Sequence, residues 1–322
     1  MSWQKILGQG YHSVNDLLSF LELPSYLGSE LAEQQFPSRV PLGFAARMKK
    51  GNPHDPLLLQ TLASVKELDS VEGYHPDPLD EESTNTLKGL IHKYHGRVLL
   101  TLTGACAINC RYCFRRHFPY QKNNPGRQGW RDVYDYIKND ESITEVILSG
   151  GDPLLASDTL LSELIRNLDR IPHLHTLRIH SRIPIVFPER IDDGLLGVLA
   201  ETRLKKIVVL HCNHPQELDE TVRQACSKLQ KIGCHLLNQS VLLAAINDDA
   251  RVLSTLSQTL FAYGVMPYYL HVLDKVTGAS HFDLPFSKVQ SIYRELQNLI
   301  PGYLLPRLAK EEPGKGSKTL LL

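Results

Sequence analysis

The chain of 322 residues has no excess of either charge, with 35 basic and 35 acidic residues. This balance argues against a protein held on nucleic acid or on an anionic membrane by long-range charge. No apolar run approaches the length of a transmembrane helix, and the first twenty residues lack the basic-then-apolar order of a signal peptide. We therefore expect a cytoplasmic protein with neither a nucleic-acid partner nor a membrane partner.

Paired cysteines are also lacking. Of the six cysteines, three fall within residues 106–113 and three are scattered. A disulfide framework is not expected in a chain of this length without an export signal. Cys212, Cys226 and Cys234 are most simply buried small hydrophobic residues, which leaves the clustered three to be explained.

From residue 97 onward, short β-branched runs alternate with longer stretches of helical periodicity. The expected strands are 97–103, 144–150, 176–182, 205–212, 235–243 and 266–274. This alternation predicts right-handed βαβ units and a parallel sheet. Six units predict an α/β fold with a partial (β/α)6 TIM-like barrel, and a doubly wound open sheet is the alternative. We expect an N-terminal helical extension at 1–90, the barrel at 91–304 and a C-terminal segment at 305–322.

Five of the six expected strands end in or lead into polar groups, and the fifth carries such groups within it; parallel βα folds bind ligands at the carboxyl ends of their strands. In chain order they are the cysteine loop, SGGDP (149–153), Ser181–Arg182, HCNH (211–214), Asn238–Gln239 and Asp274. A barrel with a purely structural role would not require this coincidence. The sequence therefore predicts a site at this end of the barrel.

Cys106, Cys110 and Cys113 have the spacing C-x3-C-x2-C. Thiolates favour iron–sulfur clusters and zinc. A closed zinc site would need a fourth ligand, for which His117 is a candidate, but zinc sites more often show two separated ligand pairs. Three thiolates would leave one iron of a 4Fe–4S cluster open to an exogenous ligand. We therefore predict a cluster and keep zinc as the alternative.

This cysteine loop, placed after the first barrel strand, resembles that of the radical S-adenosylmethionine (radical SAM) superfamily, in which the cofactor chelates the open iron. SGGDP is similar to the motif that meets the methionyl amino group, which implies cofactor binding by Gly150, Gly151 and Asp152. Arg182 and His211 match superfamily positions near the same cofactor.

A closer resemblance is to the lysine 2,3-aminomutase family, from about residue 35 to the end of the chain. It is carried, in order, by HKYHGRVLLTLTGACAINCRYCFRR, SGGDPL, SRIPIVFPERI, NQSVLLAAIND, PYYLHVLD and PGKGSKT. GNPHDPLL and CFRRHFPY are similar to the branch that makes (R)-β-lysine for elongation factor P.

The resemblance implies an isomerase that moves the α-amino group of lysine to carbon 3. Its cofactors would be a 4Fe–4S cluster, S-adenosyl-L-methionine and pyridoxal 5'-phosphate (PLP). It also implies an electron donor and a functional link to the elongation factor P lysylation ligase. The oligomeric state stays open, with a dimer among the alternatives.

For PLP, the resemblance makes Lys318 the Schiff-base lysine and places Lys93, Tyr94, Arg97 and Gln239 around the cofactor. On the residues alone, Lys318 is an ordinary solvated lysine in a glycine-rich tail. The tail would have to fold back over the barrel mouth to bring this lysine to the site.

For the substrate, Arg115 matches the arginine that binds the lysine carboxylate, and its neighbour Arg116 is the competitor. Asp274 matches a carboxylate that binds the ε-ammonium group. Glu311 stands where the family has a second aspartate, and His271 stands where it often has a tyrosine. Two acids favour a substrate with a cationic side chain.

Three other functions fit parts of the pattern. An aminomutase for another amino acid would share the same motifs. A radical SAM RNA-modifying enzyme would be expected to show a basic surface, which the neutral composition does not favour. A non-catalytic paralogue would have no need for both the cysteine loop and Lys318.

Overall fold

The computed structural model describes residues 2–81 and 83–322, so Met1 and Glu82 of the expected extension lie outside the described residues. Ten strands form one sheet in simple chain order. They are β1 (Asn85–Leu87), β2 (Leu90–Tyr94), β3 (Arg97–Thr103), β4 (Glu145–Gly150), β5 (Thr176–Ser181), β6 (Lys205–His211), β7 (Cys234–Val241), β8 (Met266–His271), β9 (Arg307–Lys310) and β10 (Thr319–Leu320).

The six predicted strands are confirmed as β3 to β8, each parallel to the next. A seventh parallel strand, β9, pairs with β8 and was not predicted. Antiparallel strands border this parallel core, with β1 and β2 on one side and β10 on the other. The strand order is linear rather than cyclic, so the partial TIM-like barrel is confirmed.

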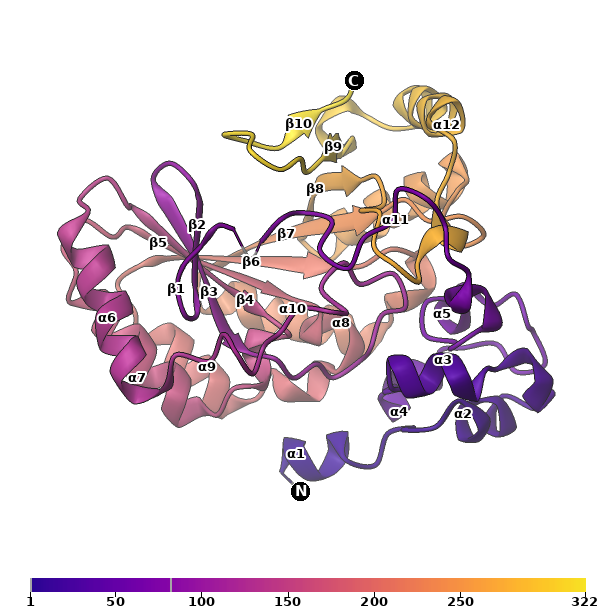
Figure 1. Cartoon of the computed structure of the whole chain (residues 1–322), viewed down its shortest axis with the longest axis horizontal. Coiled ribbons are helices and arrows are strands. Elements are labelled where there is room, and N and C mark those ends of the chain that lie inside the picture. Colours follow the sequence, from indigo (N-terminus) through magenta and orange to yellow (C-terminus); the bar gives the residue numbers. More distant parts are fainter. Residues whose placement is uncertain (1, 82) are drawn as a thin grey trace.

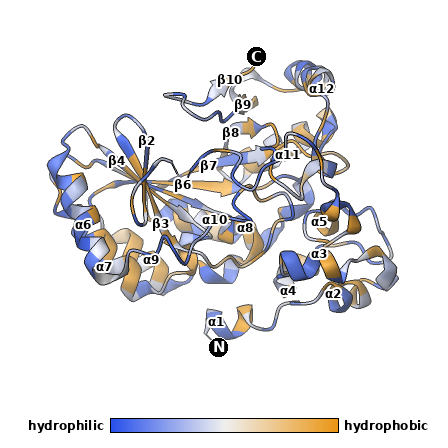
Figure 2. Ribbon diagram, in the orientation of Figure 1, coloured by the Kyte–Doolittle hydropathy of each residue, from blue (hydrophilic) through white to orange (hydrophobic). Residues whose placement is uncertain are grey.

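Helices follow the parallel strands and cover one side of the sheet (Figure 1). They are α6 (Gly126–Asn139), α7 (Asp158–Asp169), α8 (Ile183–Val186), α9 (Asp193–Ala200), α10 (Glu220–Lys231), α11 (Ala250–Ala262) and α12 (Phe286–Leu299). In α7, Ser157 caps the first turn by accepting from the Leu160 amide, and leucines at helical spacing are buried. Figure 2 shows β6 as hydrophobic along most of its length, as expected for a central strand of a parallel sheet.

The extension contains five short helices, of which α2 to α5 group together in Figure 1. They are α1 (Trp3–Leu7), α2 (Val14–Phe20), α3 (Glu30–Gln35), α4 (Leu42–Ala45) and α5 (Pro56–Leu59). Their buried side chains, Leu17 and Phe44 among them, belong to the same hydrophobic core as Leu100 of β3 and Leu148 of β4. The extension therefore packs on the barrel, and β1 falls before the expected boundary at residue 90.

Among residues 2–81 and 83–322, no helix combines the length and the apolar character that a membrane crossing requires.

Candidate active site

The loop after β3 carries Cys106, Cys110 and Cys113, all as free thiols. Burial raises the pKa of Cys106 well above its usual value and that of Cys113 to about 11, and the neighbouring thiols raise both further. Thiolates crowded in this way require compensating positive charge, as the irons of a cluster provide, so this donor set fits an iron–sulfur cluster. Within the described part of the chain, no group of three or more His, Cys, Asp or Glu side chains is arranged to hold a metal ion.

The residues proposed for other metal chemistry lie elsewhere. The His117 ring is exposed, and its Nε2 lies 3.2 Å from the carbonyl oxygen of Thr277. Cys212, Cys226 and Cys234 are buried, as expected for small hydrophobic residues. Of the six cysteines, the three of the loop therefore stay the candidates for holding a cluster.

The two glycines after β4 pack against the cysteine loop itself. A Cβ atom on Gly150 would lie 2.6 Å from the Thr103 carbonyl oxygen, and one on Gly151 would lie 2.4 Å from that of Ala105. Gly150 also has a φ of +119°, which favours glycine. The close approach predicted for these glycines is therefore made, within this structure, to the start of the cysteine loop.

Asp152 has its carboxylate engaged inside the protein. One oxygen accepts from the Leu154 amide and the Ser181 hydroxyl, and the other accepts from the amides of Arg182 and Ile183. These four bonds use the acceptor capacity of a carboxylate. Burial raises its pKa to about 6 despite them. In this structure the Asp152 carboxylate joins the ends of β4 and β5. It is not free to bind the cofactor directly, which differs from what the sequence suggested.

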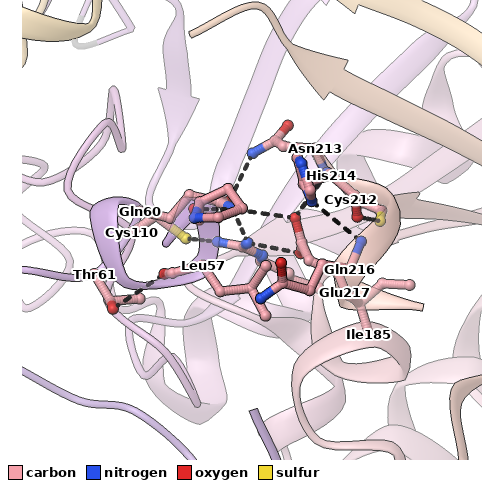
Figure 3. Close-up of polar contacts among 12 residues, drawn as sticks. Leu57, Gln60, Thr61, Cys110, Ile185, Cys212, Asn213, His214, Gln216 and Glu217 are labelled. Carbon is pink, nitrogen blue, oxygen red and sulfur yellow. Dashed lines mark hydrogen bonds and ion pairs between the residues drawn. The ribbon is translucent and has the colours of Figure 1, made fainter. Parts of the chain in front are cut away.

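Arg182 lies directly against the cysteine loop. Its Nη1 is 2.6 Å from the Cys110 sulfur, while its Nη2 donates to Gln60 at 2.7 Å and to Glu217 at 2.9 Å. Figure 3 shows Cys110, Gln60, Asn213 and Glu217 gathered in this polar network. The role of Arg182 in binding the cofactor stays a prediction, and Gln60 and Glu217 are partners that sequence reasoning missed.

The C-terminal tail folds back onto the sheet, where β10 pairs with β9. Lys318 Nζ donates to Glu311 at 2.6 Å, and the same carboxylate accepts from Lys93 at 2.9 Å and from the Tyr94 hydroxyl at 3.1 Å. Arg97 stacks on the Tyr94 ring at 4.9 Å. Lys93 and Tyr94 belong to β2, whereas Glu311 follows β9. The sheet therefore curls so that strands near its two opposite edges come together at this carboxylate.

Burial alone would raise the pKa of Glu311, but Lys318 and Lys93 outweigh it and hold that pKa well below its usual value. The carboxylate therefore stays ionised among cations. We expected Glu311 to bind the ammonium group of the substrate. In this structure its three polar partners are instead Lys318, Lys93 and Tyr94, which are predicted to hold PLP. The cationic and hydroxyl groups at this point fit a phosphate-bearing cofactor.

Asp274 lies beyond the end of β8 and keeps an unpaired carboxylate. No described residue donates a hydrogen bond to its side chain, and burial, with Glu311, raises its pKa to about 7. His211 and His271 border the same region, and burial lowers the pKa of each to about 3, so both rings are neutral. Gln239 is hydrogen-bonded to His211 Nε2 at 2.9 Å.

The two adjacent arginines of the cysteine loop have different partners. Arg115 donates to Ser149 at the end of β4 and to Glu81, whereas Arg116 pairs with Glu67 of the extension. Arg115 is therefore the one whose guanidinium group reaches the end of β4, and its role in binding the substrate carboxylate stays a prediction. Sequence reasoning missed Glu81, which no motif marks.

It also missed His180 at the end of β5. Its Nε2 is buried and has no hydrogen-bond partner among the described residues, and its ring lies 6.1 Å from that of His211. A bound group with a polar atom would satisfy this nitrogen. The signal was available in the sequence, because His180 precedes Ser181–Arg182 at a strand end.

Comparisons with known proteins show what the chain is similar to. Residues 95–176 match the model of a 4Fe-4S single cluster domain. The chain is 48% identical to the L-lysine 2,3-aminomutase of Haemophilus influenzae, over 99% of this chain and 95% of the relative. It is also 48% identical to that of Escherichia coli, over 99% and 94%. A structure of native anSMEcpe with bound AdoMet is similar at a TM-score of 0.46 and 15% identity, over 62% of this chain and 59% of that chain.

The partial barrel, the three-thiol loop after its first parallel strand and the matched cluster domain define an enzyme of the radical SAM class with a 4Fe–4S cluster. Within that class, the identity over almost the full length of both chains places the protein in one group. The chain belongs to the L-lysine 2,3-aminomutase family, which makes it an isomerase.

Proposed function

We propose that the protein converts L-lysine to β-lysine with a 4Fe–4S cluster, S-adenosylmethionine and PLP, at the carboxyl ends of the barrel strands. The observation that carries this proposal is the return of Lys318 to Glu311, Lys93 and Tyr94. The ion pair with Glu311 accounts for the position of Lys318, but a second lysine and a tyrosine hydroxyl on the same carboxylate call for a further reason. A cofactor with a phosphate group and an aldehyde supplies one.

The residues divide between the cofactors. Cys106, Cys110 and Cys113 would hold the cluster, with Arg182 against Cys110. Gly150, Gly151, Asp152 and His211 would shape the S-adenosylmethionine site, with Asp152 acting through the backbone that it holds. For PLP the set is Lys318, Lys93, Tyr94, Arg97 and Gln239. When bound, these cofactors supply the radical that takes hydrogen from carbon 3 and the carrier for the migrating nitrogen.

The protein itself binds and orients the substrate. Arg115 would bind the lysine carboxylate by charge-assisted hydrogen bonds, and Asp274 and Glu311 would bind the ε-ammonium group. Fixing both ends of the molecule sets which carbon faces the radical. The neutral rings of His211 and His271 add no positive charge that would repel a cationic side chain.

The test is anaerobic reconstitution with iron, sulfide, PLP, S-adenosylmethionine and a chemical reductant, followed by incubation with L-lysine and analysis for β-lysine. Cys110→Ser should lose cluster iron and activity, whereas Cys234→Ala, a buried cysteine outside the loop, should retain both. Accumulation of deoxyadenosine with another amino acid, and no β-lysine from lysine, would contradict the proposal. Zinc without labile sulfide would contradict the radical chemistry.

We further propose that the product is (R)-β-lysine and that it serves the elongation factor P lysylation ligase in the cytoplasm. This rests on the similarity of GNPHDPLL and CFRRHFPY to that branch of the family. Chiral chromatography of the product, and transfer of the purified product to elongation factor P by the ligase, test both statements. The division into 1–90, 91–304 and 305–322 and the need for an electron donor belong to the same proposal, and a dimer stays one alternative for the oligomeric state. Limited proteolysis and light scattering test the division and the dimer.

A further inference from the structure

Glu81 forms a bidentate ion pair with Arg115, the residue proposed to bind the substrate carboxylate. Arg115 Nε donates to one Glu81 oxygen at 2.7 Å and Nη2 to the other at 2.6 Å. Both side chains are only 8% exposed. Arg115 Nη1 donates to the Ser149 hydroxyl at 3.0 Å. The guanidinium group is therefore fixed on two sides before any substrate arrives.

This pairing leaves Arg115 able to bind a second carboxylate. A guanidinium group has five N–H donors, two on each Nη and one on Nε. Three of them are engaged with Glu81 and Ser149, so one donor on Nη1 and one on Nη2 remain. Two such donors on neighbouring nitrogens are what an end-on, bidentate carboxylate requires.

Displacement of Glu81 by the substrate is the opposing interpretation, and two observations argue against it. The Glu81 carboxylate is buried, so losing Arg115 would leave a buried charge unpaired. The chain on either side of Glu81, residues 74–81 and 83–84, is also fastened at both ends. Tyr74 donates to Asp283 at 2.7 Å, and the His75 amide donates to the Lys275 carbonyl at 2.9 Å. At the other end, the His92 amide donates to the Thr84 carbonyl at 3.3 Å.

Glu81 also lies within electrostatic reach of the other end of the proposed substrate site. Burial and Glu311 are the main causes that raise the pKa of Asp274, and Glu81 adds to them. Glu81 adds a third carboxylate to Asp274 and Glu311 in this region, and all three disfavour a substrate that carries a second carboxylate. The arrangement favours an amino acid with one carboxylate and a cationic side chain.

We propose that Glu81 is a positioning residue for the substrate, which holds Arg115 so that its two free Nη donors receive the lysine carboxylate. This inference rests on the proposed function. It predicts an effect on substrate binding through the carboxylate, and little effect on the assembly of the cluster or on PLP retention.

The test compares Glu81→Gln and Glu81→Asp with the wild type, each reconstituted with iron, sulfide and PLP but without S-adenosylmethionine. Lysine and cadaverine, which lacks the carboxylate, are titrated separately while the absorbance of bound PLP is followed. Glu145→Gln is the matched control, because Glu145 forms a similar bidentate pair with Arg178 at the start of β4 and β5. Iron content, PLP content and the thermal midpoint are measured for every variant.

Glu81→Gln should weaken lysine binding at least tenfold, Glu81→Asp should weaken it less, and neither should change cadaverine binding by more than twofold. The control should bind both ligands as the wild type does. Tighter lysine binding by Glu81→Gln would show that Glu81 competes with the substrate, and unchanged binding would show that it is only structural; either overturns the proposal. Equal losses for lysine and cadaverine overturn it too. If the wild type retains no PLP or shows no response to lysine, the proposed function fails and this inference fails with it.

Discussion

Lys318 Nζ lies 2.6 Å from a Glu311 oxygen, although one residue belongs to the glycine-rich tail and the other follows β9. The ion pair is mostly shielded from water, since the two side chains are 23% and 17% exposed. Lys93 approaches the other oxygen of the same carboxylate. Glu311 is therefore the point at which the tail, the end of β9 and the opposite side of the sheet meet.

The first prediction concerns Lys318. Lys318→Ala and Lys318→Arg should both lose the bound PLP that survives dialysis, because neither can form a covalent bond with its aldehyde. Lys318→Arg keeps a cation beside Glu311, so its loss of PLP cannot be assigned to the broken ion pair. The measurement is the visible absorbance of bound PLP. Lys315→Ala changes an exposed lysine of the same tail and should retain PLP; retention by Lys318→Ala would show that the assignment is wrong.

A second prediction concerns pH and lysine affinity. The Asp274 carboxyl group, with a pKa of about 7, is largely protonated below that pH, while the lysine ε-ammonium group stays charged until about pH 10. Lysine binding should therefore strengthen as the pH rises from about 6 to 8. Spectroscopic titration of PLP-bound protein measures this, and Asp274→Asn should bind weakly with little dependence on pH. A wild-type affinity that falls over this range would contradict the role of Asp274.

The same group sets a prediction for stability without substrate. Because the pKa of Asp274 is raised in the folded protein, the folded state binds the proton more tightly than the unfolded state does. Its contribution to stability is complete below about pH 4 and is lost as the pH rises towards 7. Asp274→Asn cannot ionise, so it does not lose this stability as the pH rises. The thermal midpoint of Asp274→Asn minus that of the wild type should therefore increase between pH 5 and pH 8, by about 2–4 °C for each kcal/mol that the wild type loses. An advantage that shrinks over this range would contradict the burial of an ionisable carboxylate.

The alternation of strand-like and helix-like stretches in the sequence was sufficient to predict much of the fold. The strands β3 to β8 have six to eight residues each, whereas β9 has only four and gives too short a pattern to identify. Strand pairing at the border of the sheet depends on the curl of the whole barrel, which no local pattern encodes. For that reason the role of Lys318 in binding PLP could be predicted only from the resemblance to the lysine 2,3-aminomutase family.

Site residues show a similar division. Cys106, Cys110 and Cys113 are close in the chain, so their spacing alone indicated shared chemistry. Asp152 and Asp274 both follow strands and look alike in the sequence, yet one is saturated by four donors and the other has none. Strand-end aspartates serve as caps as well as ligands, and only the three-dimensional contacts distinguish the two uses.

A fourth prediction tests the attachment of the extension to the cysteine loop. Glu67 is fully buried between Arg111 and Arg116, both of which donate to it. Glu67→Gln leaves two buried cations without a counter-charge and should lower the free energy of unfolding by about 3–5 kcal/mol. Glu22→Gln breaks the exposed pair with Lys50 and should cost no more than about 1 kcal/mol. Denaturant unfolding of the cofactor-free protein measures both, and equal losses would contradict the buried triad.

The last prediction concerns the contact between Arg182 and the Cys110 sulfur. A fixed positive charge beside a ligating thiolate favours the reduced cluster, which carries one more negative charge. Arg182→Gln should therefore lower the reduction potential, by about 59 mV for each tenfold change in the one-electron equilibrium. Arg182→Lys keeps the charge but cannot contact Cys110, Gln60 and Glu217 together, so its potential should lie between the two. Arg178→Gln, which removes a guanidinium bonded to Glu145, should leave the potential unchanged. Anaerobic redox titration followed by electron paramagnetic resonance gives the potentials once iron and sulfide contents are matched. A potential that stays constant in Arg182→Gln would show that the guanidinium organises the loop without acting on the cluster.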